Sequence, residues 1–456
     1  MTGQLTLFKS QSNSDLDSEP YLRELGIKIS ESRQKIQFTS NADEPVHRWA
    51  PYIQGFSASF VRNTILRFQE CYHRQKPLHV HDPFTGCGTV LVESKRLGVP
   101  STGTELNPLL AYVASVKTGC WDMCPRRLWS TFRRLRYEHP SNYPEYLKTE
   151  QHFDKEVLKN LCLIKSAIER VGNDKIRDLF RIAFASILIG CSNLKRTPCL
   201  GYDENKEVAP DTPFLLFEAK VRSIKEDLNL IQTNYRHFID TQATVYEADA
   251  RQFDAKRIDL AITSPPYMNG LDYIMNYKIE MAWLGFINNL LDAKELKKRM
   301  VACDNVSKVV TKNFYLEENK YTNDWITDIV ERIRYNTENW SLEHREKRIK
   351  RKKKNNNGIV KFMYRRNDMP VIVHKYFDDM YRVVKRIFNA LEGNGRFILV
   401  VGDSFIADVY VPTDLIIARM GKEVGFSIDS VVKARHRRSG QIMSYRLRET
   451  IVTLKK

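Results

Sequence analysis

The fold is decided by the stretch LHVHDPFTGCGTVLVESKRLGVPSTGTEL, which runs from Leu78 to Leu106. Residues 78–84 form a short run typical of a strand, the turn TGCGT follows, and residues 90–97 have the apolar spacing of a helix. VPSTGTEL, residues 99–106, is typical of a second strand. Together they predict the β-turn-α-β unit from which doubly wound α/β sheets are built.

The same alternation resumes later in the chain. Residues 244–249, TVYEAD, and 258–263, IDLAIT, are short apolar runs between polar turns, so we expect two buried parallel strands. Further on, the pattern predicts a helix (376–391), a strand (396–401), a helix (412–424) and two strands (426–434 and 449–455). The order of these elements predicts an α/β fold with one doubly wound sheet that two insertions interrupt.

The two insertions differ in character. The first is mainly helical, with periodic apolar segments at 157–171 and 176–194, and the second is polar and basic. We therefore expect a polar, mobile N-terminus (1–40), a first part of the sheet domain with the glycine turn (41–110), the helical insertion (111–240), a second part of the sheet domain (241–291), the basic insertion (292–370) and a C-terminal part (371–456).

The composition is that of a folded, soluble protein. With 42% hydrophobic and 28% charged residues among 456, the chain is neither mainly disordered nor collagen-like nor a coiled coil. The net charge of +17 points to a polyanionic partner such as nucleic acid, although a role in solubility also explains the charge taken alone.

Export, membrane and metal signals are missing from the sequence. The polar start has no basic segment followed by an apolar one, and the longest apolar run, Ile182–Ile189, falls far short of the ~18 residues of a membrane span. The eight cysteines form no CxxC pair, and we expect Cys120 and Cys124 to be buried thiols rather than zinc ligands. These features predict a cytoplasmic protein without membrane contact or metal.

The glycine turn carries the first candidate site. Asp82 and Phe84 end the strand, and Gly86 and Gly88 allow a tight turn at which a ligand can reach the N–H groups of the next helix. Glu105 follows Asp82 by 23 residues, near the ~20-residue spacing at which an acidic side chain binds ribose hydroxyls. An ordinary βα loop is the alternative. The turn lacks a third glycine, and Asp82 favours a cofactor with a cationic amino-acid end, such as S-adenosylmethionine.

The end of the fourth predicted strand carries the second candidate site, Ser264-Pro265-Pro266-Tyr267. Two successive prolines lack N–H donors and leave carbonyl groups free at the carboxyl edge of the sheet. Those carbonyls and the Ser264 hydroxyl are acceptors for an amino group, and Tyr267 offers a flat face, which suits a base swung out of its stack. Asp249, at the end of the third strand, can accept from an adenine amino group. Alone, SPPY would indicate only a stiff turn with a core tyrosine.

The motifs DPFTGCGT, TELNP and TSPPY together resemble those of the S-adenosylmethionine-dependent DNA amino-methyltransferases. The resemblance implies a mostly parallel, seven-stranded Rossmann-like methyltransferase sheet that binds S-adenosylmethionine. It places the amino-acid end of the cofactor at Asp82 and Gly86, the ribose at Glu105 and the adenosine beside Phe84. WAPYIQGFSASFV resembles the segment that encloses the methionine end, although the start of a helix explains Phe56 and Ser57 nearly as well. The implied cofactor-binding residues are Asp82, Pro83, Phe84, Gly86, Gly88, Thr89, Glu105, Asp249, Phe56 and Ser57.

The implied reaction is methyl transfer to the exocyclic amino group of a flipped base in double-stranded DNA. Such an amine is a poor nucleophile, so we expect Ser264 Oγ and the Pro265 carbonyl to accept its N–H groups and aim its nitrogen at the methyl group. The candidate catalytic residues are Ser264, Pro265, Pro266 and Tyr267. Cys87 is expected to pack in the interior rather than act as a nucleophile. 5-Methylcytosine is disfavoured as the product because a carbon-5 mechanism needs a thiol next to a proline at the end of the fourth strand, where Ser264 stands.

The choice of base rests on the resemblance. Family members with serine at the first motif position are more often cytosine-N4 enzymes, so we expect N4-methylcytosine, within restriction-modification or a related role. The alternatives are an adenine-N6 DNA methyltransferase, an RNA amino-methyltransferase and an inactive nucleic-acid-binding protein.

Two basic groups are candidates for contact with DNA. Residues 343–366 hold eleven Lys or Arg against two Glu, although a solvated loop explains such a run equally well. A second group follows a predicted strand near residue 435, where an ordinary polar hairpin is the alternative. The candidate DNA-binding residues are Lys350, Arg351, Lys352, Lys353, Lys354, Arg365, Arg366, Arg435, Arg437 and Arg438. We also consider a companion restriction endonuclease as a partner, and association with a prokaryotic nucleoid.

Overall fold

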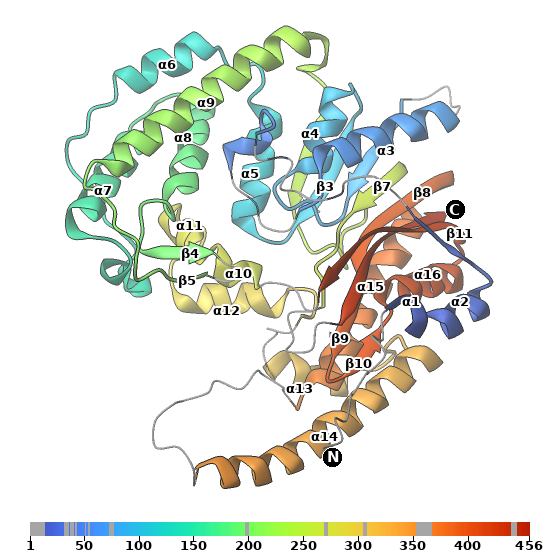
Figure 1. Cartoon of the computed structure of the whole chain (residues 1–456). Coiled ribbons are helices and arrows are strands. Elements are labelled where there is room, and N and C mark those ends of the chain that lie inside the picture. The colour runs from blue at the N-terminus through green and yellow to red at the C-terminus, as the bar shows by residue number, and fades with distance from the viewer. Residues whose placement is uncertain are drawn as a thin grey trace, which may run out of the picture.

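The computed structural model describes residues 14–31, 36, 41, 43–50, 52, 55–72, 77–196, 200–268, 272–303, 308–352, 367–438 and 445–456. An eight-stranded sheet in the order β1-β11-β12-β8-β7-β2-β3-β6 forms its centre (Figure 1). Its strands are β1 (Ile29–Glu31), β2 (Val80–Asp82), β3 (Ser101–Glu105), β6 (Ala243–Glu247), β7 (Ile258–Thr263), β8 (Leu391–Gly402), β11 (Ser427–Arg438) and β12 (Arg446–Lys455). Two short hairpins lie outside it, β4–β5 (Leu194–Arg196, Leu200–Tyr202) and β9–β10 (Ser404–Ile406, Val409–Val411).

Helices connect the strands and surround the sheet. They are α1 (Ser14–Asp17), α2 (Glu19–Leu25), α3 (Ala58–Cys71), α4 (Thr89–Arg96), α5 (Pro108–Gly119), α6 (Pro125–Arg133), α7 (Lys155–Glu169), α8 (Asp174–Ile187), α9 (Thr212–Asn234), α10 (Tyr273–Asn276), α11 (Lys278–Trp283), α12 (Leu290–Lys298), α13 (Lys308–Leu316), α14 (Asp324–Lys352), α15 (Met369–Ala390) and α16 (Thr413–Val424).

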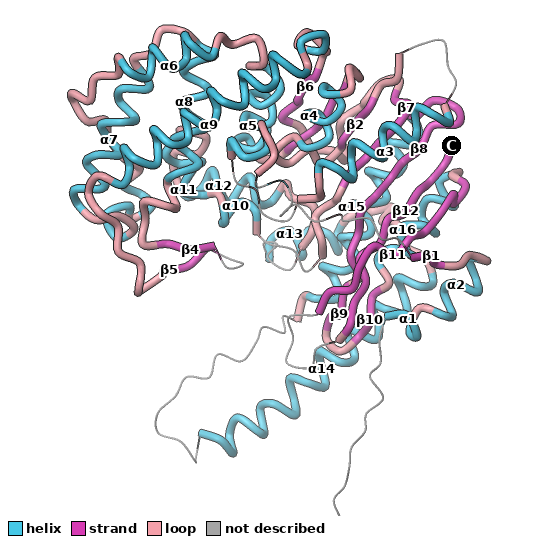
Figure 2. Tube along the Cα trace, turned by 45° about the horizontal axis from the view of Figure 1, so that its top comes forward, coloured by secondary structure: helices cyan, strands magenta, loops and turns pink. Residues whose placement is uncertain are grey.

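The predicted doubly wound, mostly parallel sheet is confirmed. β8, β7, β2, β3 and β6 pair in parallel, whereas β12 runs antiparallel between β8 and β11. Side chains of β8 alternate between two helical layers: Ile398 and Val400 share a core with α3, and Leu399 and Val401 share one with α15 and α16. Helices therefore cover both faces, and Figure 2 shows the strands side by side between them.

The predicted count of seven strands is wrong, because β1 adds an eighth at the edge. β1 pairs in parallel with β11, in the register Ile29 with Val431. The segment before it packs against the sheet core through partly buried apolar side chains, namely Tyr21, Leu22, Leu25 and Ile27. Residues 14–31, expected as part of a polar, mobile N-terminus, hold α1, α2 and β1 in the structure, and Tyr21, Leu22 and Leu25 have the i, i+1, i+4 spacing of a helix face.

The environment of another strand differs from the expected one. The sequence pattern predicts a buried β6, but β6 is the last strand of the sheet, and Thr244, Tyr246 and Glu247 are exposed. An edge strand has a neighbouring strand on one side only, so its residues are less enclosed than those of a central strand. β7, for which the pattern makes the same prediction, is buried along its whole length.

The described part of the helical insertion forms a lobe of α6–α9 beside α5 (Figure 1). Its core contains buried aromatic and aliphatic residues from several helices, and the β4–β5 hairpin, which the sequence pattern did not predict, lies on the lobe. Buried Asp227 of α9 ties the lobe to the segment that precedes α3. It accepts hydrogen bonds from Val46 N at 2.9 Å, Trp49 Nε1 at 2.8 Å and Arg48 Nη2 at 2.5 Å.

The basic insertion contains α12, α13 and the long α14, which extends away from the body of the molecule (Figures 1 and 2). Ile326, Ile329 and Ile333 recur at helical spacing and are buried in the same core as α15. The beginning of α14 is thus fixed to the sheet domain. Nothing in the structure tests the predicted domain boundaries as such, and they remain our proposal.

No helix in the described ranges has both the length and the apolar character to cross a bilayer. Among the same residues, no three His, Cys, Asp or Glu side chains gather as metal ligands would. Cys120 is buried as expected, but Cys124 is exposed, because it lies just before α6 at the surface of the lobe.

Candidate active site

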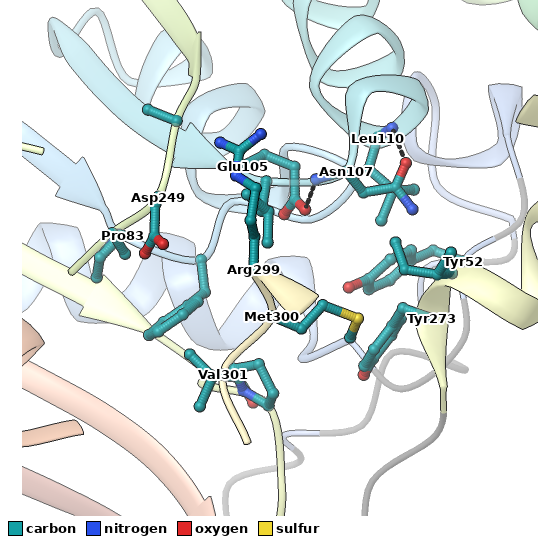
Figure 3. Close-up of a pocket in the computed structure, with 17 residues that line it drawn as sticks. Tyr52, Pro83, Glu105, Asn107, Leu110, Asp249, Tyr273, Arg299, Met300 and Val301 are labelled. Carbon is teal, nitrogen blue, oxygen red and sulfur yellow. Dashed lines mark hydrogen bonds between the residues drawn. The ribbon is translucent and has the colours of Figure 1, made fainter. Parts of the chain in front are cut away.

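The carboxyl ends of four neighbouring parallel strands open onto one cavity, the site where open α/β sheets bind ligands. The hollow holds about 660 Å³ of space outside protein atoms, including the solvent at its mouth (Figure 3). Each strand contributes lining residues: Pro83 and Phe84 after β2, Glu105 to Asn107 at the end of β3, Ala248 to Ala250 after β6, and Ser264 and Pro266 after β7.

Asp82 ends β2 and lies behind the cavity wall. It is 1% exposed, and its Oδ1 accepts hydrogen bonds from Phe84 N at 3.0 Å and from Thr263 Oγ1 at 2.7 Å. Burial raises the pKa of Asp82 to about 7, while these two hydrogen bonds lower it. Asp82 therefore joins the glycine turn (residues 83–88) to the end of β7.

Both glycines of the turn have backbone angles that favour glycine. The φ of Gly86 is +53° and that of Gly88 is +89°. A Cβ on Gly86 would lie 2.6 Å from the hydroxyl oxygen of Tyr52, and one on Gly88 would lie 3.0 Å from the Cβ of Ala114. The turn thus passes close to Tyr52, and Gly88 caps α4, in which Thr89 is the first residue.

Glu105 connects the turn to the next strand. Its two carboxylate oxygens accept hydrogen bonds from Gly86 N and Asn107 N, both at 2.8 Å. Burial raises the pKa of Glu105 to about 7, and the backbone hydrogen bonds lower it. The carboxyl group lines the cavity and keeps further lone pairs for a ligand hydroxyl.

Asn107 supplies a donor on the same wall. Its Oδ1 caps α5 by accepting from Leu109 N at 3.0 Å, a role that Asn often fills at a helix start. Its Nδ2 is buried and has no hydrogen-bond partner among the described residues. A buried N–H group without a partner is costly, so a ligand acceptor in the cavity would satisfy it.

Asp249 is held by a guanidinium. Arg251 forms an ion pair with Asp249 at 2.6 Å and another with Asp379 of α15 at 2.7 Å. Burial would raise the pKa of Asp249, but the hydrogen bonds and charge of Arg251 outweigh it, and the pKa is lowered. Asp249 therefore faces the cavity as an oriented carboxylate.

Several lining residues escaped sequence reasoning. Tyr52 and Tyr273 line the cavity with ring centroids 6.2 Å apart and planes at 18°. Tyr52 belongs to the WAPYIQGFSASFV stretch, whose resemblance to a cofactor-enclosing segment could have indicated Tyr52 as a lining residue. Arg299 to Val301 also line the cavity, although they belong to the predicted basic insertion, and no local pattern marked them.

The four residues of the SPPY motif divide into two environments. Ser264 and Pro266 line the cavity and Pro265 is buried. Tyr267 is half-buried, and its hydroxyl donates to Glu449 of β12. The Arg437 guanidinium lies 5.3 Å from the ring centroid of Tyr267, and Arg435 donates to the same Glu449. Burial and the Glu449 carboxylate raise the pKa of Tyr267, so this phenol stays protonated.

Six of the ten expected cofactor residues lie outside the cavity lining: Asp82, Gly86, Gly88 and Thr89, which belong to β2, the glycine turn and the start of α4 behind it, and Phe56 and Ser57. Phe56 is buried in the core under α3, with its ring edge-on to Phe60 at 5.9 Å. Ser57 Oγ accepts from Phe60 N at 3.2 Å and caps α3. The helix-start interpretation therefore accounts for both side chains.

The candidate DNA-binding residues are only partly described. Arg435 and Arg437 make the protein contacts given above. Arg438 ends β11, and Lys350, Arg351 and Lys352 end α14, but only their backbones are described. Lys353, Lys354, Arg365 and Arg366 lie outside the described residues. Their contact with DNA remains a prediction.

Similarity to known proteins points to one enzyme class. The chain is 24% identical over 439 residues to the type II methyltransferase M.AvaI of Nostoc sp., covering 88% of this chain and 83% of that protein. It is 22% identical to M.BsoBI of Geobacillus stearothermophilus, covering 89% and 84%, and 26% identical to M.MvaI of Kocuria varians, covering 53% and 58%. The chain is a methyltransferase homologue. These relatives imply S-adenosylmethionine as the methyl donor, which the sequence also predicts.

Two other comparisons add no argument. No protein-family model matches the chain. A solved rRNA methyltransferase, aviRa from Streptomyces viridochromogenes, covers 94% of this chain and 96% of its own at 9% identity, but with a TM-score of 0.33.

The residues of the cavity fit S-adenosylmethionine. Glu105 and Asp249 are acceptors for hydroxyl and amino groups, and Asn107 Nδ2 is a donor without a partner among the described residues. Phe84, Tyr52 and Tyr273 supply flat apolar faces on the wall of the cavity.

Proposed function

We propose that this chain is a DNA methyltransferase that transfers a methyl group from S-adenosylmethionine to the exocyclic amino group of a flipped base, with cytosine N4 as the first candidate. One observation carries the proposal. Ser264 and Pro266 of the SPPY motif line the same cavity as Glu105 and Asp249. The hydrogen-bond acceptors proposed for the cofactor and those proposed for the amino group therefore line one cavity, as direct transfer of the methyl group requires.

On the cofactor side, the proposal assigns a contact to each wall. Glu105 binds the ribose hydroxyls, Asp249 accepts from the adenine amino group, and Phe84 packs on the adenosine. Asp82 and Gly86 shape the end of the turn that faces the amino-acid part, next to Tyr52. When bound, S-adenosylmethionine supplies a methyl group activated by its positive sulfur.

On the acceptor side, Ser264 Oγ and the Pro265 carbonyl accept the two N–H groups of the amine. These hydrogen bonds favour a pyramidal nitrogen and orient its lone pair toward the methyl group. Tyr267 stacks on the extruded base, and Glu449 fixes the tyrosine ring by accepting its hydroxyl hydrogen. Cys87 is 2% exposed and belongs to the core shared with the helical lobe, so it is not placed as a nucleophile.

Adenine N6 is the second candidate acceptor, because adenine also presents an amino group beside a ring nitrogen. Double-stranded DNA is the proposed substrate, since the relatives named above are type II methyltransferases and this chain has a net charge of +17. A companion restriction endonuclease and a cytoplasmic, nucleoid-bound location belong to the same proposal.

Mass spectrometry of nucleosides from a bacterial host that expresses the chain tests this function. We expect N4-methylcytosine in DNA and none in a host that expresses the Ser264→Ala, Tyr267→Ala double variant. N6-methyladenine would select the second candidate base, and methylated RNA with unmodified DNA would replace the DNA proposal. If 5-methylcytosine is the sole product, or if the double variant is fully active, the mechanism is wrong.

A further inference from the structure

An exposed arginine stands at the mouth of the cavity. Arg299 directly follows α12 and lines the cavity together with Glu105 and Asp249. Figure 3 shows its side chain among the residues that line the cavity, between the labelled Asp249 and Asn107 in this view. No role was assigned to it on sequence grounds.

The backbone that carries Arg299 is fixed on both sides. The Arg299 carbonyl accepts a hydrogen bond from Arg251 Nη2 at 2.5 Å, and Ala302 N donates to Asp379 Oδ2 at 2.9 Å. Arg251 also bridges Asp249 and Asp379, so the segment 299–302 is bound to the frame that orients Asp249. Met300 and Val301 are 9% and 6% exposed, which leaves Arg299 as the exposed side chain of the segment.

The guanidinium of Arg299 makes no hydrogen bond or ion pair within the part of the chain that the structure describes. Its neighbours on α12 differ: Lys298 pairs with Glu295 at 2.6 Å and Lys297 with Asp272 at 2.5 Å. The nearby carboxylate of Asp249 is already bound by Arg251 through both oxygens. Arg251, and after it the charge of Arg299, lower the pKa of Asp249, but within the described residues no hydrogen bond or ion pair holds the planar guanidinium of Arg299.

We propose that Arg299 is a cofactor-binding residue whose guanidinium stacks on the adenine ring and closes the cavity mouth; this inference rests on the proposed function. Arg299 lies on the side of the cavity that holds Glu105 and Asp249, the proposed ribose and adenine acceptors, whereas the amino-acid end faces Gly86 and Tyr52. A guanidinium stacks well on a flat heterocycle, and it does so better than the ammonium of lysine.

Binding measurements on the full chain test the assignment, with adenosine and S-adenosylhomocysteine as probes. Arg299→Ala should weaken both ligands by a similar factor, on the order of tenfold. Arg299→Lys should recover only part of this affinity, because it keeps the charge without the planar face. Lys298→Ala, on the same exposed turn, should bind both probes like the wild type, and DNA affinity should stay unchanged in Arg299→Ala.

Other outcomes would contradict the inference. Wild-type affinity for both probes in Arg299→Ala would overturn the inference, as would full recovery in Arg299→Lys. Reduced DNA affinity with unchanged affinity for S-adenosylhomocysteine would make Arg299 a phosphate-binding residue instead. If the wild-type chain binds neither probe, the proposed function itself fails, and that result is distinct from an effect of the variants. Thermal unfolding of each variant checks that the fold is kept.

Discussion

Replacing Gly86 with alanine should weaken cofactor binding in addition to lowering stability. The change forces an L residue to keep a φ of +53°, which costs roughly 1–2 kcal/mol, the cost of the left-handed region. The added Cβ would also lie 2.6 Å from the hydroxyl oxygen and 2.9 Å from the Cζ of Tyr52, so the Tyr52 ring must move. Because Tyr52 lines the cavity, the displacement changes the cavity wall.

The chain contains a matched control. Gly98, in the turn between α4 and β3, has a φ of +69°, and its added Cβ would lie 2.5 Å from the Cε1 of Phe238. Gly98→Ala therefore has a similar backbone cost and a similar collision with an aromatic ring, but away from the cavity lining. Both variants should be destabilised by about 1–2 kcal/mol or somewhat more in urea unfolding.

Calorimetry with S-adenosylhomocysteine separates the two variants. Gly86→Ala should bind at least about tenfold more weakly, the equivalent of ~1.4 kcal/mol, while Gly98→Ala should bind like the wild type. Gly86→Val should bind no measurable ligand. Folded Gly86→Ala with wild-type affinity would refute the placement of the cofactor against the turn, and equally weakened binding in both variants would show that the effect is general destabilisation.

Three further results are expected. Burial raises the pKa of Asp82 and Glu105 to about 7, so between about pH 4 and about pH 7 the folded chain keeps protons that the unfolded chain releases. The free energy of unfolding should therefore fall as pH rises from about 4 to about 7 and then level off. Urea titrations of Asp82→Asn should show a smaller fall of this free energy with pH, and an unchanged fall would contradict the assignment. Tyr267→Ala should slow methyl transfer because base stacking, worth ~1–3 kcal/mol, is removed at nearly unchanged cofactor affinity, and Ser264→Ala should have the smaller effect, both measured as single-turnover rates. Neutralising Lys350 to Lys354 should weaken DNA binding equally for all sequences. The slope of log affinity against log salt concentration should become shallower by somewhat less than ~0.9 for each phosphate that is no longer neutralised. Selective weakening for one sequence would instead indicate that these residues read bases.

The central strands and the site at their ends were predictable because their signals are local. A nearly continuous apolar run marks β7, and β2 is marked by the glycine turn that directly follows it, as β7 is by its two prolines. No such pattern marks β1. It is an edge strand in which Ser30 and Glu31 are exposed, so it needs no apolar run.

The rest of the cavity depends on contacts across the fold. Arg299 reaches the cavity because Asp379 and Arg251 bind its segment, and both partners are distant in sequence. Glu449 meets Tyr267 across 182 positions, so nothing near either residue marks the pair. The sequence marks Arg435 and Arg437 only as candidate DNA-binding residues, and the position of β11 in the sheet is what brings them beside Tyr267 and Glu449.

The position of β12 has a consequence for the order in which the protein is made. β12 lies between β8 and β11 in the sheet, yet it follows both in the sequence, so the ribosome completes it after them. Until then β8 has an open edge, which is a template for pairing with other chains, and Tyr267 lacks its carboxylate partner. A nascent chain that stalls before Glu449 is therefore exposed to aggregation and cannot hold the SPPY tyrosine in place, so the catalytic arrangement forms only after translation has passed β12.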